Sequence, residues 1–430
     1  MISRLFDFLN ESPVNFLAVQ AVAKRLDAAG FRRLEPTGSL GRVEAGERVY
    51  VTKNDSSIYA FHIGEKPLSE AGFHIICAHA DSPTFRIKPN PEICVENSIV
   101  KLNVEVYGGA ILSTWFDRPL SLAGRVIIRT DDAMHPQTRL LHIQKPLLTI
   151  PNLCIHFNRQ VNDGVKLSVQ KDMQPILGLV ADKFEKNALL MSLICRELSV
   201  EAKDIIDFDL YLYDTTKPCV FGANDEFISA GRLDDLSMVH AGLEALLAVS
   251  DKLPKTTRVL AIFDNEETGS HTKQGAASPF LANMIDRLVL AQGGSREDYY
   301  RTIEHAFMIS ADNAHAYHPN HGEKYDPNCH PLLGKGPAIK FNAAQKYASD
   351  AVSASVFESI CREAGVPCQR FVNHSDVAGG STLGNILTAT MPIAGVDMGN
   401  AILAMHSVRE TGSVQDHEYC IRAFTHFFEL

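Results

Sequence analysis

The sequence predicts an α/β fold in which a main domain, built on a mixed, largely parallel sheet flanked by helices, carries an inserted, mainly β domain. At 430 residues the chain exceeds one ordinary hydrophobic core, which favours two domains. After residue 229, helix-like and strand-like patterns alternate, as is typical of a largely parallel sheet. Before it, period-two alternation with frequent proline and glycine favours strands. We therefore expect residues 1–88 and 228–430 to form the main domain and residues 89–227 the insertion.

The individual elements follow from apolar periodicity and from start and stop signals. Ser12 and a proline in the first turn predict a helix that runs to Ala29, where Gly30 ends the pattern. In the main domain we expect strands at 48–53, 57–63, 72–78, 257–263 and 306–310, and helices at 233–250, 350–364 and 415–428. In the insertion we expect strands at 98–107, 122–130 and 139–143.

Composition excludes several classes of function. The net charge of −10 argues against nucleic acid as a partner, because phosphate binding needs a basic face. No apolar run approaches the ~20 residues of a membrane span, and the N-terminus lacks the apolar core of a secretory signal. The nine cysteines include no CxxC pair, which favours reduced thiols. We expect a cytoplasmic protein without a membrane or nucleic-acid partner.

Three polar side chains follow buried strands of the main domain. His79, Glu267 and Asp312 each come directly, or almost directly, after an apolar run. In open α/β sheets, ligands bind beyond the carboxyl ends of the strands. We therefore expect these three side chains to gather at one edge of the sheet.

Each candidate also has an ordinary interpretation. A histidine after a strand is most often structural, but Asp81, two residues beyond His79, is the kind of carboxylate that orients a metal-bound imidazole. Asp234 and Asp235 precede a helix, where paired aspartates are most often N-caps. A carboxylate that bridges two metals is the alternative, and the residues alone leave both interpretations open.

Further candidates lie elsewhere in the main domain. Glu266 and Glu267 are adjacent, which ordinarily indicates a solvated loop, but here they follow a buried strand. His406 follows another apolar run and offers a second imidazole. His318 and His321 are also spaced like ligands, but a proline between them breaks any helix, and we interpret both as structural or hydrogen-bonding.

Together these residues have the right chemistry for two zinc ions. The pair of ions carries four positive charges, and Asp234, Glu267 and Asp312 supply three negative ones. The remaining charge favours a bound hydroxide, the nucleophile that zinc produces near neutral pH. Glu266 is adjacent to a ligand without being one, so it can take the proton of the attacking water. The residues thus indicate metal-assisted hydrolysis.

Six segments in order give the chain a resemblance to the aspartyl aminopeptidase family of zinc metallopeptidases. The resemblance covers essentially the whole chain, and six ordered matches are far more specific than any one. The segments are 77–83 (CAHADSP), 150–156 (IPNLCIH), 231–236 (GRLDDL), 263–270 (FDNEETGS), 310–320 (SADNAHAYHPN) and 405–410 (MHSVRE).

The resemblance implies a metal centre with two Zn²⁺ per chain. Asp234 is expected to bridge the two ions. His79 and Asp312 complete one site, and Glu267 and His406 complete the other. A cis peptide bond after the bridging aspartate is a further expectation, carried over from related two-zinc aminopeptidases.

The resemblance also implies the roles of the surrounding residues. Glu266 is the proton shuttle, with Asp81 as a further catalytic residue. His156 is expected to reach a neighbouring subunit's active site from the inserted domain, and Lys340 and His315 to line the pocket for the substrate's first side chain. The family forms dimers built into a dodecamer, so we expect a homo-oligomer and a dimerisation role for the insertion.

The implied activity is removal of N-terminal residues, Asp or Glu by preference, from peptides through a zinc-bound hydroxide. Lys340 carries the preference, because a buried ammonium needs a carboxylate partner. A carboxylate of the protein itself is the alternative partner. Asn152, Cys154, Thr268 and the loop 374–384 depart from the family pattern, which leaves the fine specificity open.

Other functions share part of this pattern. A broad or leucine-preferring aminopeptidase, or a deacylase of the same superfamily, would use the same metal chemistry on different substrates. A non-catalytic shell or cargo protein would keep the fold and lose a metal ligand or the general base. In this sequence all five expected ligands and the base Glu266 are present. Metal storage would not need the additional Glu266.

Overall fold

The computed structural model describes residues 1–180 and 188–430, which form two compact units. The main unit contains Met1–Asp81, Pro218–Met405 and Glu410–Leu430, and the inserted unit contains Ser82–Lys217 with the short segment His406–Arg409. The structural junctions thus lie several residues before the expected ones at 88 and 227.

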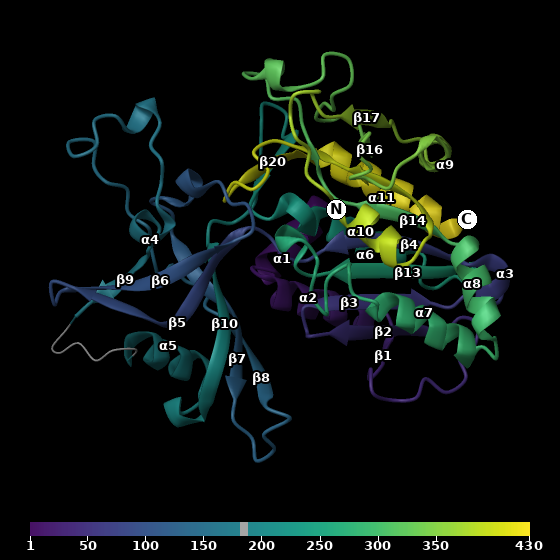
Figure 1. The fold of residues 1–430 in the computed structure, drawn as a ribbon, viewed down its shortest axis with the longest axis horizontal. Helices are drawn as coiled ribbons and strands as arrows, with labels where there is room; N and C mark the ends of the chain where they lie inside the picture. Colours follow the sequence, from purple (N-terminus) through teal and green to yellow (C-terminus); the bar gives the residue numbers. More distant parts are fainter. Residues whose placement is uncertain (181–187) are drawn as a thin grey trace. The chain divides into compact units, whose positions relative to one another are not determined.

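A nine-stranded sheet forms the centre of the main unit (Figure 1). In spatial order its strands are β1 (Arg32–Arg33), β2 (Arg48–Lys53), β3 (Ser57–His62), β13 (Thr257–Phe263), β4 (Phe73–His79), β14 (Phe307–Ala311), β18 (Ala394–Gly399), β16 (Ala338–Phe341) and β17 (Gln369–Val372). The four central strands from β13 to β18 are parallel, and β3 and β16 pair with them in antiparallel fashion. The predicted mixed, largely parallel sheet is confirmed.

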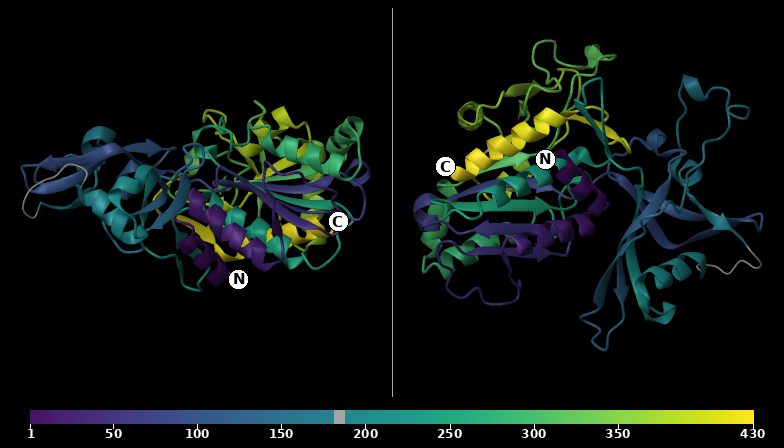
Figure 2. Two further views of the ribbon diagram at one scale, coloured as in Figure 1. Left: turned by 90° about the horizontal axis from the view of Figure 1, so that it is seen from below. Right: turned by 180° about the vertical axis from the view of Figure 1, so that it is seen from behind.

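Helices cover both faces of this sheet (Figures 1 and 2). Successive strand residues point to opposite faces, so Ile76 and Ala78 enter one core while Ile75 and Cys77 enter the other. The first core includes α1 (Ile2–Glu11), α2 (Asn15–Ala28), α6 (Leu233–Ala248), α9 (Ala351–Glu363) and α11 (Val414–Glu429). The second includes α3 (Leu68–Ala71), α7 (Phe280–Ala291), α8 (Arg296–Glu304) and α10 (Leu383–Thr390). Burial on both faces explains the uninterrupted apolar runs of the central strands.

Short elements complete the main unit near the ends of the central strands. The 3₁₀ turn η4 (Glu266–Thr268) follows β13, and η5 (Gly322–Lys324) lies in a later loop. The two small sheets are formed by β11 (Cys219–Phe221), β12 (Phe227–Ala230) and β20 (Glu410–Ser413), and by β15 (Ala314–His315) with β19 (Ala401–Ile402). In the part of the chain that the structure describes, no helix has the length and apolar character needed to cross a membrane.

The inserted unit is built on a six-stranded antiparallel sheet, so its mainly β character agrees with the sequence pattern. Its strands, in spatial order, are β8 (Gln137–His142), β7 (Leu120–Ile128), β10 (Ile205–Asp214), β5 (Thr84–Val95), β6 (Ile99–Tyr107) and β9 (Ile176–Leu179). Its helical elements are η1 (Leu112–Trp115), η2 (Val161–Asp163), α4 (Val169–Asp172), α5 (Ala188–Leu198) and η3 (Ala202–Asp204). Helix α5 was not expected; it buries Leu190, Leu193, Ile194 and Leu198, which share one helical face.

Candidate active site

The expected ligands of the main unit stand at the ends of three neighbouring strands. His79 is the last residue of β4, Asp312 follows β14, and Glu267 lies in η4 just after β13. These strands are adjacent and parallel, so their carboxyl ends lie at the same edge of the sheet. Asp234 reaches this edge from the first turn of α6. We call it the metal edge.

Two groups of side chains at the metal edge have the geometry of a metal site. Within each group, the possible ligand atoms all lie within 4.8 Å of one another. The first group consists of His79, Asp234, Asp235 and Asp312, all buried. The second consists of His79, Glu266 and Glu267. Imidazole nitrogen and carboxylate oxygen are ordinary zinc ligands, so the donors present fit that metal.

Asp81 fixes the geometry of the metal edge. The Nδ1–H of His79 donates to the backbone carbonyl of Asp81 at 3.0 Å, and Nδ1 lies 3.4 Å from the Asp81 carboxylate. The other ring nitrogen, Nε2, lies 3.6 Å from Oδ1 of Asp234. The Asp81 carboxylate also accepts hydrogen bonds from the backbone N–H groups of Glu266 (3.2 Å) and Glu267 (3.1 Å). One carboxylate therefore positions both the imidazole and the turn that carries the two glutamates.

Asp235 is not among the ligands expected from the sequence, yet its carboxylate takes part in the same network. It accepts a hydrogen bond from the backbone N–H of His79 at 3.1 Å and one from the side-chain amide of Asn313 at 3.3 Å. The backbone N–H of Asp234 donates to Glu410 at 3.0 Å. The peptide bond between Asp234 and Asp235 is cis, as the resemblance led us to expect.

Burial and crowding of carboxylates shift the pKa values at the metal edge. Burial raises the pKa of Glu266 to about 8, against the opposing effect of His79. Burial also raises the pKa of Asp235 and Asp312, with Lys340 opposing the shift at Asp312. Burial alone would lower the pKa of His79, but Asp235 and other carboxylates raise it well above its usual value. The site thus concentrates negative charge away from water, an excess that a bound cation would neutralise.

Lys340 is buried in β16, and its ammonium lies 3.5 Å from the Asp312 carboxylate and 5.7 Å from the ring centroid of Tyr347. The alternative foreseen from the sequence, a partner supplied by the protein itself, is therefore present. Burial would lower the pKa of Lys340, but Asp312 raises it overall, so the ammonium stays charged. His315 is exposed in β15, and its ring contacts Phe371, which lies opposite Lys340 in the strand register.

Two expected site residues belong to the inserted unit. His406 begins the segment His406–Arg409, and its Nδ1 donates to the carbonyl of Gly109 at 3.1 Å. His156 is exposed in a loop of that unit. The same loop exposes three large apolar side chains, those of Leu153, Ile155 and Phe157. The roles expected of His406 and His156 remain predictions.

A parallel sheet with a histidine, clustered carboxylates and a buried glutamate at its edge defines a class, the metal-dependent hydrolases of α/β fold. The chain matches the family described as aminopeptidase I zinc metalloprotease (M18) over residues 8–428. It is 51% identical over 428 residues to a probable M18 family aminopeptidase 2 of Clostridium novyi, covering 100% of this chain and 98% of that protein. It is 42% identical over 430 residues to the protein of the same name from Ectopseudomonas mendocina, with the same shares covered.

Solved structures agree with this assignment. A chain of the cryo-EM structure of the Ape4 and Nbr1 complex is 35% identical and superposes with a TM-score of 0.95, covering 99% of this chain and 85% of that one. The M18 aminopeptidase of Thermotoga maritima is 24% identical with a TM-score of 0.86, and the match covers 100% of this chain and 95% of that one. A chain of the S. cerevisiae mApe1 dodecamer is 24% identical with a TM-score of 0.87, and the match covers 99% of this chain and 95% of that one. Both share the fold of this chain. The chain belongs to the M18 family of zinc aminopeptidases.

The raised pKa values predict how the stability of the metal-free protein depends on pH. Between its ordinary pKa and about 8, Glu266 is protonated in the folded protein and ionised in the unfolded chain. The folded state then binds more protons, so stability falls as pH rises through this interval. His79, Asp235 and Asp312, whose pKa values are also raised, act in the same direction.

We expect the free energy of unfolding of the zinc-free protein to fall between pH 7 and 8, with about 1 kcal/mol arising from Glu266 alone. This window lies above the ordinary pKa of histidine, so the buried histidines with lowered pKa, such as His62 and His74, contribute little to the change. Denaturant unfolding at the two pH values measures it. The matched variant Glu266→Gln should show a smaller decrease, and identical decreases would contradict the prediction.

Proposed function

We propose that this enzyme binds two zinc ions per chain and removes N-terminal residues, Asp or Glu by preference, from peptides. The observation that carries the proposal is the pair of overlapping donor groups that share His79, the second of which includes the partly buried Glu266. Family membership supports zinc as the metal. Two groups of donors that share one histidine support a pair of ions over a single one.

The proposed ligand set combines these donor groups with the family resemblance. Asp234 lies next to His79 and would bridge the two ions. His79 and Asp312 would complete one site, and Glu267 and His406 would complete the other. Asp235, which bonds to the backbone of His79, would support this arrangement without binding metal.

When bound, zinc supplies Lewis acidity, which polarises the scissile carbonyl and lowers the pKa of water. The chain's own residues position and move the proton. The backbone N–H of Glu266 is held by Asp81, and its carboxylate belongs to the donor group beside His79, so Glu266 would accept the proton of the attacking water and deliver it to the leaving amine. Asp81 also holds the ring of His79 with Nε2 toward Asp234.

The preference for acidic residues would come from Lys340. Its ammonium has three donors, and a single contact to Asp312 at 3.5 Å does not use all of them. A substrate Asp or Glu would supply that carboxylate, whereas a leucyl side chain would desolvate the charge without pairing it. The existing pair with Asp312 favours the alternative, a broad or leucine-preferring aminopeptidase, because the charge is already partly compensated.

The inserted unit would serve in assembly. Leu153, Ile155 and Phe157 expose apolar surface around His156, and Phe157 is 81% exposed. Such side chains are usually covered by a partner. By the family resemblance, the partner is a second copy of this chain, the loop delivers His156 to that copy's active site, and dimers assemble into a dodecamer.

Glu266→Gln should retain two zinc ions per chain and lose activity by about 10²- to 10⁴-fold, because an amide cannot carry the proton. Metal analysis and turnover on aminoacyl substrates measure the two properties in one preparation. Near-normal turnover with full metal would remove Glu266 from the mechanism. A wild-type protein that is inactive despite full metal would instead support a non-catalytic shell protein.

Lys340→Met should narrow or reverse the ratio of kcat/KM for aspartyl or glutamyl over leucyl substrates. The ratio is the deciding quantity, since loss of the Asp312 contact also lowers absolute rates. Lys335→Met is the matched control, because Lys335 is exposed in the loop before β16. Faster cleavage of leucyl substrates by the wild type would show that the pocket is misassigned, although the metal chemistry would stand.

His156→Gln should assemble normally and lose activity, and co-expression with Glu266→Gln should restore it in part. In mixed dimers, the Glu266→Gln chain supplies an intact His156 to a site that has an intact Glu266. Random pairing predicts about a quarter of wild-type activity, since half of the dimers are mixed and half of their sites are complete. Mass measurement in solution checks assembly. An active monomer would contradict the proposal, and a dimer without the dodecamer would leave the His156 role intact.

A further inference from the structure

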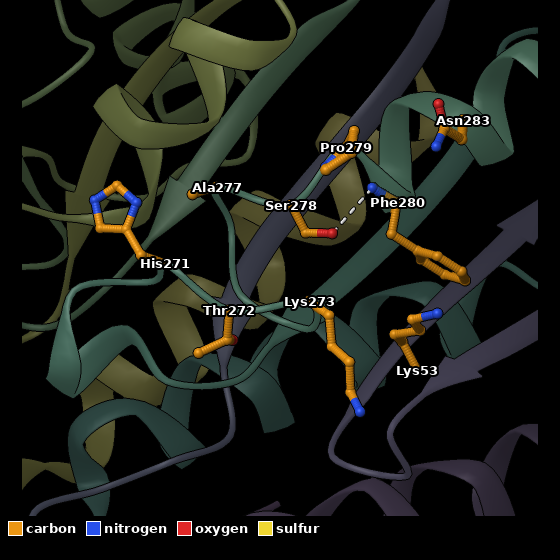
Figure 3. A pocket seen from close by; sticks show the side chains of 9 residues that line it. All are labelled: Lys53, His271, Thr272, Lys273, Ala277, Ser278, Pro279, Phe280 and Asn283. Carbon is orange, nitrogen blue, oxygen red and sulfur yellow. Dashed lines mark hydrogen bonds between the residues drawn. The ribbon is translucent and has the colours of Figure 1, made fainter. Parts of the chain in front are cut away.

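A hollow of about 550 Å³ lies beside the first turn of α7, and no residue of the proposed catalytic set lines it. Its walls come from separate parts of the main unit (Figure 3). Lys53 is the last residue of β2, and Phe280 is the first residue of α7. Thr272 and Lys273 belong to the loop that connects η4 to α7. We call this hollow the lysine pocket.

The lysine pocket is unusual in its charge. In a chain of net charge −10, two lysines line it, and the described residues around it include no Asp or Glu. Lys53 lies against the ring of Phe280, with Nζ 5.0 Å from the ring centroid (Figure 3). Among the residues that the structure describes, neither Lys53 nor Lys273 forms an ion pair. Two ammonium groups that share a hollow repel each other, and an anion placed between them would relieve the repulsion.

Neutral donors complete the lining. The hydroxyl of Ser278 and the side-chain amide of Asn283 line the same hollow, whereas the single O–H of Thr272, which also lines it, is donated to Asn265. The first turn of α7, a helix of twelve residues, is also there, and its N-terminal N–H groups and dipole favour negative charge. Ammonium, hydroxyl and N–H groups together are the donors that bind carboxylate and phosphate oxygens.

The loop that lines the lysine pocket is bonded to the catalytic turn. The hydroxyl of Thr272 donates to the side-chain oxygen of Asn265 at 2.9 Å, and the side-chain amide of Gln274 donates to the same oxygen at 2.7 Å. Asn265 directly precedes Glu266 and has a left-handed backbone, with φ of 59°. A ligand that holds Thr272 in place would therefore also steady Asn265, the residue directly before the proposed base Glu266.

We propose that the lysine pocket is a binding site for an oxyanion, recognised by Lys53 and Lys273 and completed by the start of α7. The shared chemistry is a phosphate or carboxylate group. It has two possible sources, free phosphate or the carboxylate at the far end of a peptide substrate. The second source rests on the proposed peptidase function, and the first does not.

The first arm of the test measures binding of inorganic phosphate to the zinc-loaded enzyme by calorimetry at constant ionic strength. The double variant Lys53→Gln/Lys273→Gln should bind phosphate about tenfold more weakly, because each charge-assisted hydrogen bond contributes strongly to affinity. The control Lys24→Gln/Lys66→Gln removes the same charge from exposed positions outside the pocket and should bind like the wild type. Phosphate held at the metal edge would be unaffected in both variants.

The second arm compares kcat/KM for peptides that end in a free carboxylate with the same peptides amidated at the C-terminus. If the peptide is the source, the wild type and the control prefer the free acid, and the pocket variant loses that preference while still cleaving the amide. A change confined to the pocket variant in either arm supports the site and identifies its source. The proposal is overturned if neither arm shows a change confined to the pocket variant, or if the control loses phosphate binding as much as the pocket variant does. Inactivity of all three proteins on every peptide would count against the peptidase function, while the phosphate arm would still decide the site.

Discussion

The carboxylate of Asp81 is the group on which the geometry of the metal edge depends. It lies beside Nδ1 of His79 at the end of β4 and accepts the N–H groups of Glu266 and Glu267 beyond β13. Asp81 is only 2% exposed, so these hydrogen bonds are not replaced by water. Since β4 and β13 are hydrogen-bonded neighbours, one buried acid fixes the imidazole and the glutamate turn relative to each other. A proton shuttle needs this rigidity, because its reach is a single hydrogen bond.

The sheet provides the rest of that rigidity at a cost in electrostatics. Strands buried on both faces bring acidic side chains to one edge with little solvent, which raises the pKa values of Asp235, Asp312 and Glu266. Without a cation, the folded protein compensates by retaining protons. A bound metal would replace those protons, so the packing that raises the pKa values of these carboxylates also determines how strongly they bind a metal.

Features of the fold and site that depend on local sequence pattern were predicted, whereas most contacts between residues far apart in the sequence were not. Three of the four central strands, β4, β13 and β14, were predicted, because burial on both faces gives an apolar run that ends at a polar residue such as His79. The fourth, β18, was not among the expected strands. Helix α5 was not predicted either, since its helical periodicity lies inside a segment whose other patterns indicate strands. The donor types of the metal edge were visible in the sequence, whereas the bond from Asp235 to His79 joins residues 156 positions apart. The pair between Lys340 and Asp312 was foreseen only as an alternative, because strand neighbours follow from sheet order and not from local pattern.

Under the proposed function, the pair of Lys340 and Asp312 would connect substrate selection to metal binding. The Asp312 carboxylate lies within reach of the Lys340 ammonium and also belongs to the donor group of His79 and Asp234. A carboxylate has two oxygens, so Asp312 can serve a metal with one and the ammonium with the other. A metal bound to Asp312 would withdraw electron density from this carboxylate and weaken its contact with Lys340, which would leave the ammonium better able to bind a second carboxylate. If Lys340 lines the substrate pocket as proposed, the selectivity of that pocket would depend on the metal content of the edge, and a change at Lys340 would act on both.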